Sequence, residues 1–142
     1  MTTQSLTHMH RRCFVCGEDS PSGLRARFEL ADGRISGRFQ VREDLQSLPG
    51  VTHGGILAAL MDAAMAQWLL QNGVVAVTAL LQTKFHRSLA PGSWITITAW
   101  PRPDRGEDDR QYHLKSRIVD NRQRTIAQSE AVFVRYEEST GE

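Results

Sequence analysis

The segment from Gly54 to Leu70 is almost wholly apolar, and Asp62 is its only charged residue. Between Leu45 and Thr83 the chain carries no other Asp, Glu, Lys or Arg. A helix that is apolar on nearly every face must be surrounded by the rest of its domain, so we predict one buried central helix here. A lone carboxylate in that setting is costly unless it is paired, hydrogen-bonded or hydrated. Asp62 is therefore either a residue that reaches the surface or a catalytic carboxylate in a substrate pocket.

The length and charge of the chain limit what it can be. We interpret residues 1–142 as a single domain, with an N-terminal turn segment over 1–22 and a tail over 137–142. The formal net charge of +1 argues against a nucleic-acid partner bound by bulk electrostatics. No apolar run approaches a membrane span, and residues 1–5 lack the core of a signal peptide. We expect a cytoplasmic protein with no nucleic acid and no membrane as partner.

The regions around the central helix predict strands. Residues 24–30 alternate between apolar and polar, as a half-buried strand does, and a turn signal follows at 31–33. A second strand follows over 35–39, and the helix is expected to stop near Asn72-Gly73. Four later strands are predicted over 74–85, 94–100, 112–118 and 125–136. Because hairpin-connected strands pair antiparallel, we predict an α+β fold with an antiparallel sheet of five or six strands wrapped around one long central helix.

Two cysteines, Cys13 and Cys16, stand close behind His8 and His10. With no secretory signal, a disulfide is not expected. A Cys2His2 zinc site is conceivable. However, His-x-His two residues before Cys-x-x-Cys is not a usual ligand spacing, and no βαβ pattern surrounds the pair as a redox motif would require. We expect a tight, partly buried turn here, and no metal.

Several motifs together resemble the PaaI-type acyl-CoA thioesterases of the hotdog superfamily. The resemblance runs from about residue 13 to residue 136. It rests on the order of elements, on an acid nine residues beyond His53, and on these segments: Cys13-Phe14-Val15-Cys16-Gly17, Pro21-Ser22-Gly23-Leu24, Pro49-Gly50-Val51-Thr52-His53-Gly54-Gly55, Val77-Thr78 and Pro91-Gly92. A His-Gly-Gly motif alone is a weak signal, and the combination is fairly specific.

The resemblance implies a hotdog fold and a role for five residues. Asp62 would act as general base toward water or as nucleophile on the thioester carbonyl. The backbone N–H groups of His53, Gly54 and Gly55 would bind the thioester oxygen, and Thr78 would help to position water. The site would lie between two subunits of a homodimer or homotetramer, with Asp62 of one chain facing His53 and Gly54 of the other. The substrate would be an acyl-CoA, with no cofactor.

Two positions depart from the family pattern. Many members have Asn or Gln six residues before the histidine, where this chain has Ser47 with Gln46 beside it. Some have a second acid directly after the helical Asp, where this chain has Ala63.

Thioester hydrolysis at this site also has support that does not depend on the resemblance, because a helix N-terminus offers unpaired N–H groups and a positive dipole end to a developing oxyanion. A thiolate leaving group also needs no strong general acid.

Each of these residues also has a plainer interpretation. His53 could cap the helix while Gly54 alone binds the oxygen, and Thr78 could be an ordinary strand residue. Three side chains at helical spacing are expected in the core rather than in an acyl pocket: Met61, Met65 and Trp68. Three arginines of the 101–110 turn could meet CoA phosphates, although their acidic neighbours favour a solvated loop: Arg102, Arg105 and Arg110.

Three other functions are left open. A non-catalytic acyl-CoA-binding hotdog module would keep the fold and the pocket but would not need Asp62. A hotdog hydratase or dehydratase would need a differently placed acid or histidine, and no such pair surrounds His86 or His113. A small zinc-binding interaction protein built on Cys13 and Cys16 is the third. The nature of the acyl chain is not predictable, since two subunits would form the pocket.

Overall fold

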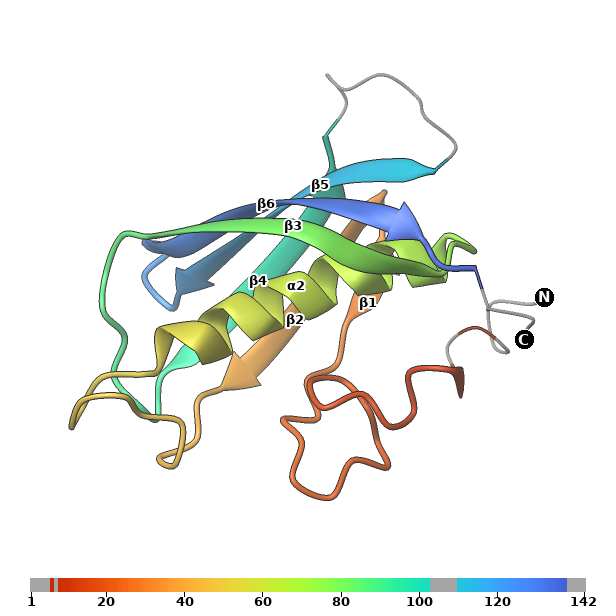
Figure 1. Ribbon diagram of the computed structural model, residues 1–142. Coiled ribbons are helices and arrows are strands. Elements are labelled where there is room, and N and C mark those ends of the chain that lie inside the picture. The colour runs from red at the N-terminus through yellow and green to blue at the C-terminus, as the bar shows by residue number, and fades with distance from the viewer. Residues whose placement is uncertain (1–5, 7, 103–109, 138–142) are drawn as a thin grey trace.

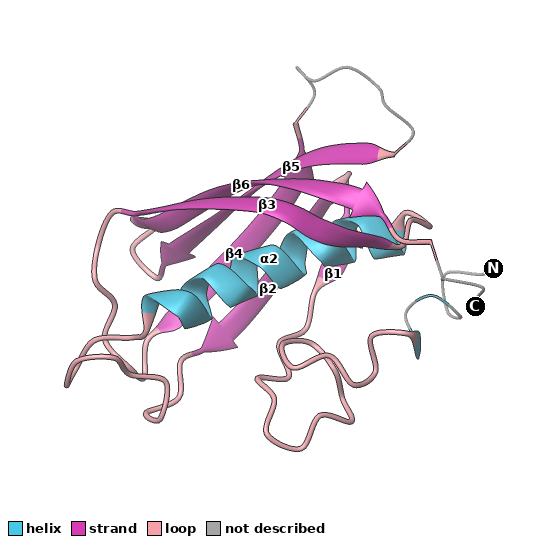
Figure 2. Cartoon of the chain, in the orientation of Figure 1, coloured by secondary structure: helices cyan, strands magenta, loops and turns pink. Residues whose placement is uncertain are grey.

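One helix lies along one face of a curved antiparallel sheet (Figure 1). The computed structural model describes residues 6, 8–102 and 110–137. Helix α2 spans Gly54–Gln71. The strands are β1 (Glu29–Ala31), β2 (Arg34–Gln40), β3 (Ala76–Phe85), β4 (Trp94–Pro101), β5 (Gln111–Asp120) and β6 (Thr125–Arg135). They form one sheet in the order β1-β2-β4-β5-β6-β3, and all neighbours are antiparallel, so the predicted α+β hotdog architecture is confirmed (Figure 2).

The core lies between α2 and the inner face of the sheet. Half of the helical residues are buried, and Met61 and Met65 are fully so, as predicted. They pack among alternating strand residues such as Ile97 on β4 and Phe133 on β6. Trp68 is only half-buried, and its indole N–H donates to the carbonyl oxygen of Gly33 at 2.9 Å. In the described part of the chain, no helix is both long enough and apolar enough to cross a membrane.

The predicted strand over 24–30 is largely wrong, because only Glu29–Ala31 pairs as β1. Arg25 has a φ of 54°, a left-handed conformation that interrupts an extended strand. The N–H groups of Leu24 and Ala26 donate to the carbonyls of Phe14 and Val15, at 2.8 Å each. The alternating pattern arises because this segment buries Leu24 and Ala26 under the N-terminal loop, rather than in the sheet ladder.

Strand β3 is the last strand of the sheet and contains a bulge. Thr78 lies opposite Phe133 and Leu81 opposite Ala131, with a shift of register between Thr78 and Leu80. Since side chains of a strand alternate between faces, residues 78 and 81 would normally point to opposite sides. The bulge brings both to the face that α2 covers. Val77 and Leu80 remain 51% exposed on this edge strand.

Candidate active site

The first turn of α2 is closed by His53. This residue is extended, with φ −62° and ψ 124°, and its ring Nδ1 accepts the N–H of Gly55 at 2.9 Å. Its carbonyl oxygen accepts the N–H of Ile56 at 3.0 Å and that of Leu57 at 3.4 Å. Within the described residues, no group accepts the N–H of Gly54, so this is the donor that the helix start can offer to a ligand.

These bonds assign two roles that the sequence left open. His53 does cap the helix, and in its neutral form the ring proton then lies on Nε2, because Nδ1 is the acceptor. The N–H of Gly55 is already used by that cap. The N–H of His53 donates to the carbonyl of Leu45 at 2.8 Å. Of the three expected oxygen-binding N–H groups, only that of Gly54 is therefore free, with the positive end of the helix dipole behind it.

A hollow of about 350 Å³ opens beside Gly54. The N–H of Thr52 donates to the carbonyl of Leu89 at 2.8 Å, which places the helix start against the 85–89 loop. Phe85, His86 and Arg87 line the hollow together with Thr52. The buried hydroxyl of Thr52 has no hydrogen-bond partner among the described residues. Sequence reasoning missed these residues, since nothing in the spacing shows that the two loops meet.

Asp62 projects from the middle of α2 toward β3. The hydroxyl of Thr78 donates to its Oδ1 at 2.6 Å, so the structure brings together two of the predicted site residues, 16 positions apart in the chain. Burial raises the pKa of the Asp62 carboxyl, the Thr78 hydrogen bond lowers it, and the negative charge of the Cys13 thiolate raises it. The net direction is upward, as expected for a carboxylate in an apolar helix.

Gly54 and Asp62 of one chain are too far apart to act on the same carbonyl group. They are eight residues apart on one helix, and a rise of about 1.5 Å per residue separates them by roughly 12 Å. A reacting carbonyl must lie about 3 Å from both the nucleophile and the oxyanion donor. We call the Gly54 donor and the Asp62–Thr78 pair two half-sites, because a single chain does not bring them to one carbonyl group.

The positions that depart from the family pattern have clear places in the structure. Ser47 lines the hollow beside Gly54. The amide of Gln46 is used within its own loop, where it donates to the carbonyl of Glu43 at 2.6 Å and accepts the N–H of Gly50 at 2.7 Å. Ala63 is buried in the core, so no second carboxylate lies next to Asp62 on the helix. Ser47, rather than Gln46, is the polar side chain available to the hollow.

Two of the three turn arginines are described. Arg102 forms an ion pair with Glu130 at 2.8 Å and is tied to the sheet. Arg110 directly precedes β5, and its carbonyl accepts the N–H of Arg135 at 3.0 Å. Arg105 and its acidic neighbours lie outside the described residues. The ion pair of Arg102 agrees with the plainer interpretation of this turn.

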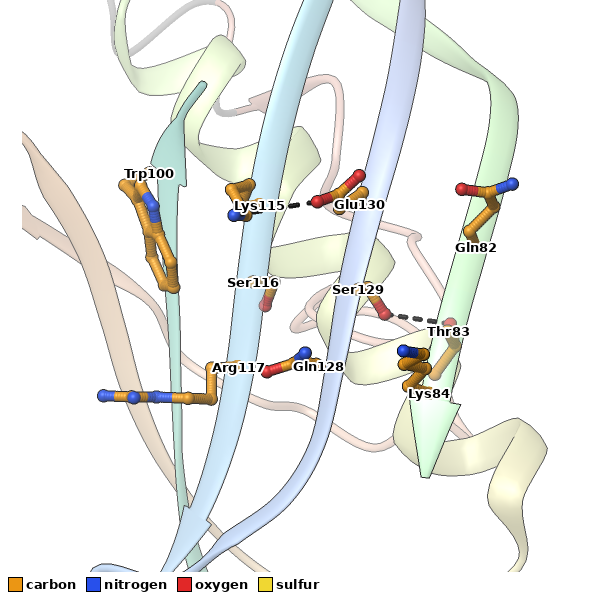
Figure 3. Close-up of a pocket in the computed structure, with 10 residues that line it drawn as sticks. All are labelled: Gln82, Thr83, Lys84, Trp100, Lys115, Ser116, Arg117, Gln128, Ser129 and Glu130. Carbon is orange, nitrogen blue, oxygen red and sulfur yellow. Dashed lines mark hydrogen bonds and ion pairs between the residues drawn. The ribbon is translucent and has the colours of Figure 1, made fainter. Parts of the chain in front are cut away.

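A second hollow, of about 620 Å³, lies on the face of the sheet turned away from α2 (Figure 3). Its floor carries Trp100, Arg117 and Lys115, and the Lys115 ammonium lies 3.6 Å from the Glu130 carboxylate. None of the five predicted site residues lines it. This hollow is larger than the one beside Gly54, but the predicted site residues lie on the other face of the sheet, the face that α2 covers.

The comparisons with known proteins agree with the fold. Residues 49–102, which include the His-Gly-Gly turn, α2, β3 and β4, match the family model described as thioesterase superfamily. A crystal structure of a thioesterase superfamily protein matches with 26% identity and a TM-score of 0.79, over 87% of this chain and 63% of that one. This chain thus spans less than two thirds of that protein. A comparison with curated proteins gives no match.

Two further solved structures are similar in fold. The E. coli PaaI protein from the phenylacetic acid degradation operon is 21% identical, with a TM-score of 0.77, over 96% of this chain and 95% of that one. A hypothetical thioesterase from Streptococcus pneumoniae, solved with coenzyme A, is 15% identical, with a TM-score of 0.72, over 81% of this chain and 88% of that one. The class defined by fold and site is a hotdog-fold protein. Its central segment matches the thioesterase superfamily model, and the resemblance to the PaaI-type members is confirmed in fold.

Proposed function

We propose that this protein is an acyl-CoA thioesterase that hydrolyses an acyl-CoA to the free acid and CoA, without a cofactor. The observation that carries the proposal is the Asp62–Thr78 pair. A thioesterase-superfamily fold keeps one half-buried carboxylate in an apolar helix and fixes one of its oxygens with a hydroxyl at 2.6 Å. Oδ2 is then the oxygen that can accept a proton from water or attack the carbonyl carbon.

The proposed reaction uses the two half-sites together. In the first route Asp62 is the general base and takes a proton from water while the water oxygen bonds to the thioester carbon. The Gly54 N–H donates to the carbonyl oxygen as it becomes negative. The C–S bond then breaks, and CoA leaves as a thiolate that takes up the proton. With Asp62 as nucleophile, an acyl-enzyme anhydride forms first and water hydrolyses it. The residues at the site are compatible with both routes.

We propose further that the site is shared between two copies of the chain. The axial rise of roughly 12 Å between the backbone positions of Gly54 and Asp62 favours a partner that brings its own Gly54 to this Asp62. β3 is a ten-residue edge strand with exposed Val77 and Leu80, and it carries Thr78 at its start. An edge of this kind is suited to pairing with its own copy about a two-fold axis. The proposed unit is a homodimer, which could pair again into a tetramer.

The hollow beside Gly54 is suited to the substrate. Arg87 brings a cation to its lining, where the phosphates of CoA could be bound, and Phe85 gives it an apolar wall. A CoA ester as substrate fits the expected cytoplasmic location. The acyl chain, aliphatic or aromatic, would contact residues of both chains.

A non-catalytic acyl-CoA-binding module is the second candidate function. The same hollow would support it, but binding alone gives no reason to keep a single carboxylate on an apolar helix, where it is costly. The Asp62–Thr78 pair therefore favours the enzyme over the binding module.

The test is a panel of aliphatic and aromatic acyl-CoA esters, with release of free thiol followed for each. We expect at least one ester to be hydrolysed by the parent protein. Asp62→Asn should lose this hydrolysis, whereas Asp32→Asn, the same chemical change in the distant β1–β2 turn, should keep the parental rate. Equilibrium binding of the same esters separates the two functions. If esters of the panel bind and none releases thiol, the proposed thioesterase activity is wrong and the binding module takes its place.

A further inference from the structure

Residues 8–23 form a tight loop beside the C-terminal half of α2 (Figure 1). The N–H of Cys13 donates to the carbonyl of His10 at 3.0 Å, and the N–H of Gly17 to the carbonyl of Cys13 at 2.9 Å. A Cβ at Gly17 would lie 2.4 Å from the Arg11 carbonyl oxygen and 2.5 Å from the Cys13 nitrogen. The loop therefore requires glycine directly after its second cysteine.

This loop gathers three side chains that are typical metal ligands. His10 Nδ1, Cys13 Sγ and Cys16 Sγ all lie within 4.8 Å of one another, and all three residues are partly buried. The His10 Nδ1–Cys16 Sγ distance is 3.5 Å. Zn–S bonds of about 2.3 Å and Zn–N bonds of about 2.0–2.1 Å at tetrahedral angles place sulfur and nitrogen about 3.5 Å apart. The ligand spacing is thus close to that of an assembled tetrahedral site.

A buried amide supports one of the two sulfur atoms. Gln67 on α2 is only 6% exposed, and its Nε2 donates to Cys16 Sγ at 3.3 Å. Its Oε1 accepts the amide of Gln71 at 2.9 Å, and that amide also donates to the Phe28 carbonyl at 3.1 Å. This chain fixes which end of the Gln67 amide faces the sulfur. An oriented N–H donor is the outer-shell partner that a metal-bound thiolate uses.

We propose that His10, Cys13 and Cys16 bind one zinc ion. No further His, Cys, Asp or Glu of the described residues joins the cluster, so a water molecule would complete the tetrahedron. Both cysteines bind the ion as thiolates, and the proton that Cys16 still holds goes to solvent. The nearby cation Arg11 is paired with Asp19 at 2.7 Å, which lowers its repulsion of a metal ion. The ion would fasten the N-terminal loop to α2 through Cys16 and Gln67.

This proposal replaces the expectation of a metal-free turn. That expectation rested on the spacing of two histidines and two cysteines as a four-ligand set. His8 points elsewhere, because its Nε2 lies 3.0 Å from a guanidinium nitrogen of Arg11, while His10 reaches Cys16 across the turn. The relevant set has three protein ligands, and their grouping depends on the fold of the loop.

The test is elemental analysis of the full-length protein after purification in zinc-containing buffer and desalting. We expect about one zinc per chain. His10→Ala and Cys16→Ser should each lower the bound zinc at least tenfold, whereas His8→Ala, the same change two residues away, should keep it. Cobalt titration of the parent gives a readout that does not depend on the folding of any variant: a tetrahedral thiolate site gives intense visible bands and thiolate-to-cobalt charge transfer.

Three results would overturn the zinc site, independently of any result on hydrolysis. One is less than a tenth of an equivalent of zinc together with no cobalt spectrum. The second is an equal loss of zinc in His8→Ala and His10→Ala. The third is a Cys13–Cys16 disulfide in the protein purified under reducing conditions, detected by mass as the loss of two hydrogens.

Discussion

The first turn of α2 and its middle differ in what they offer a substrate and in how they are built. The first turn offers a hydrogen-bond donor, the backbone N–H of Gly54. Its orientation is set by three consecutive residues, His53, Gly54 and Gly55. The middle of the helix offers the carboxylate of Asp62, whose orientation depends on Thr78 from a separate strand. Hydrolysis needs both the donor and the acceptor. Because their backbone positions lie about 12 Å apart along one helix, the proposed mechanism needs each chain to supply one half to each of two sites.

The largest expected effect is at the middle of the helix. Asp62→Asn keeps the size and the acceptor for the Thr78 hydroxyl but cannot take a proton or attack carbon. We expect acyl-CoA hydrolysis to fall by about 10²–10⁴-fold. Binding of the ester should persist, since a partly buried charge is removed. Steady-state kinetics with a matched Asp32→Asn control measures this, and a parental rate in Asp62→Asn would refute the catalytic role.

The first turn should respond differently to two neighbouring changes. Gly54→Val crowds the approach to the free N–H, and its Cβ would meet the Phe85 ring at 3.4 Å. Phe85 is exposed and can move, so we expect folding to be kept and kcat to fall by about 10²–10³-fold. In Gly55→Ala the new Cβ lies 2.9 Å from His53 Cε1 and disturbs the cap.

Loss of the cap in Gly55→Ala should chiefly lower stability, by about 0.5–2 kcal/mol. Thermal melts and kcat of both variants separate the two effects. Equal activity of Gly54→Val and the parent would rule out Gly54 as the oxyanion donor.

The strand that supports Asp62 should set the pH dependence. Thr78→Val removes the hydroxyl that lowers the pKa of the Asp62 carboxyl, so that pKa should rise further. The acid limb of kcat/KM should move to higher pH, with a loss of about tenfold on that limb, a modest value because Asp62 is only partly buried. Thr96→Val, on the outer face of β4, is the matched control. An unmoved acid limb in Thr78→Val would separate Thr78 from the titration.

The smallest effect is on stability. The pKa of Asp62 is raised in the folded protein, so its contribution to stability is full below the unfolded pKa and is lost as pH rises through the folded pKa. Asp62→Asn should therefore be more stable than the parent at neutral pH and equal to it in acid. A gain of about 1 kcal/mol would raise Tm by about 2–4 °C. A parent that is the more stable of the two at pH 7 would contradict the raised pKa.

The sequence predicts features that are set by neighbouring residues better than features that depend on contacts between distant segments. The helix limits follow from nearby residues, the His53 cap and the Asn72-Gly73 stop, and the structure confirms them. The predicted strand over 24–30 is largely wrong because an alternating pattern does not show whether its buried side chains face a sheet or a loop. The family resemblance implies a role for Asp62 and one for Thr78, but neither the resemblance nor composition predicts the contact between them. It depends on a bulge between Thr78 and Leu80 that leaves no mark in the alternation.

Details of the site that involve side-chain orientation were also beyond sequence reasoning. The His53 ring is oriented so that its Nδ1 accepts the N–H of Gly55, and this N–H is then no longer available to bind the thioester oxygen. The hollow beside Gly54 joins Thr52 to Phe85, His86 and Arg87, which come from a loop more than 30 positions later in the chain. Such groupings arise from packing between distant segments, which periodicity does not encode.

The shared site is the central claim, and complementation tests it most directly. Chains carrying Asp62→Asn and chains carrying Gly54→Val are given different affinity tags, and the mixed dimer is purified through both tags. One of its two sites would combine an intact Asp62 with an intact Gly54 from the other chain. We predict about half the parental kcat per dimer, although each variant alone is nearly inactive. A mixed dimer as inactive as the two variants would contradict a site built from both chains.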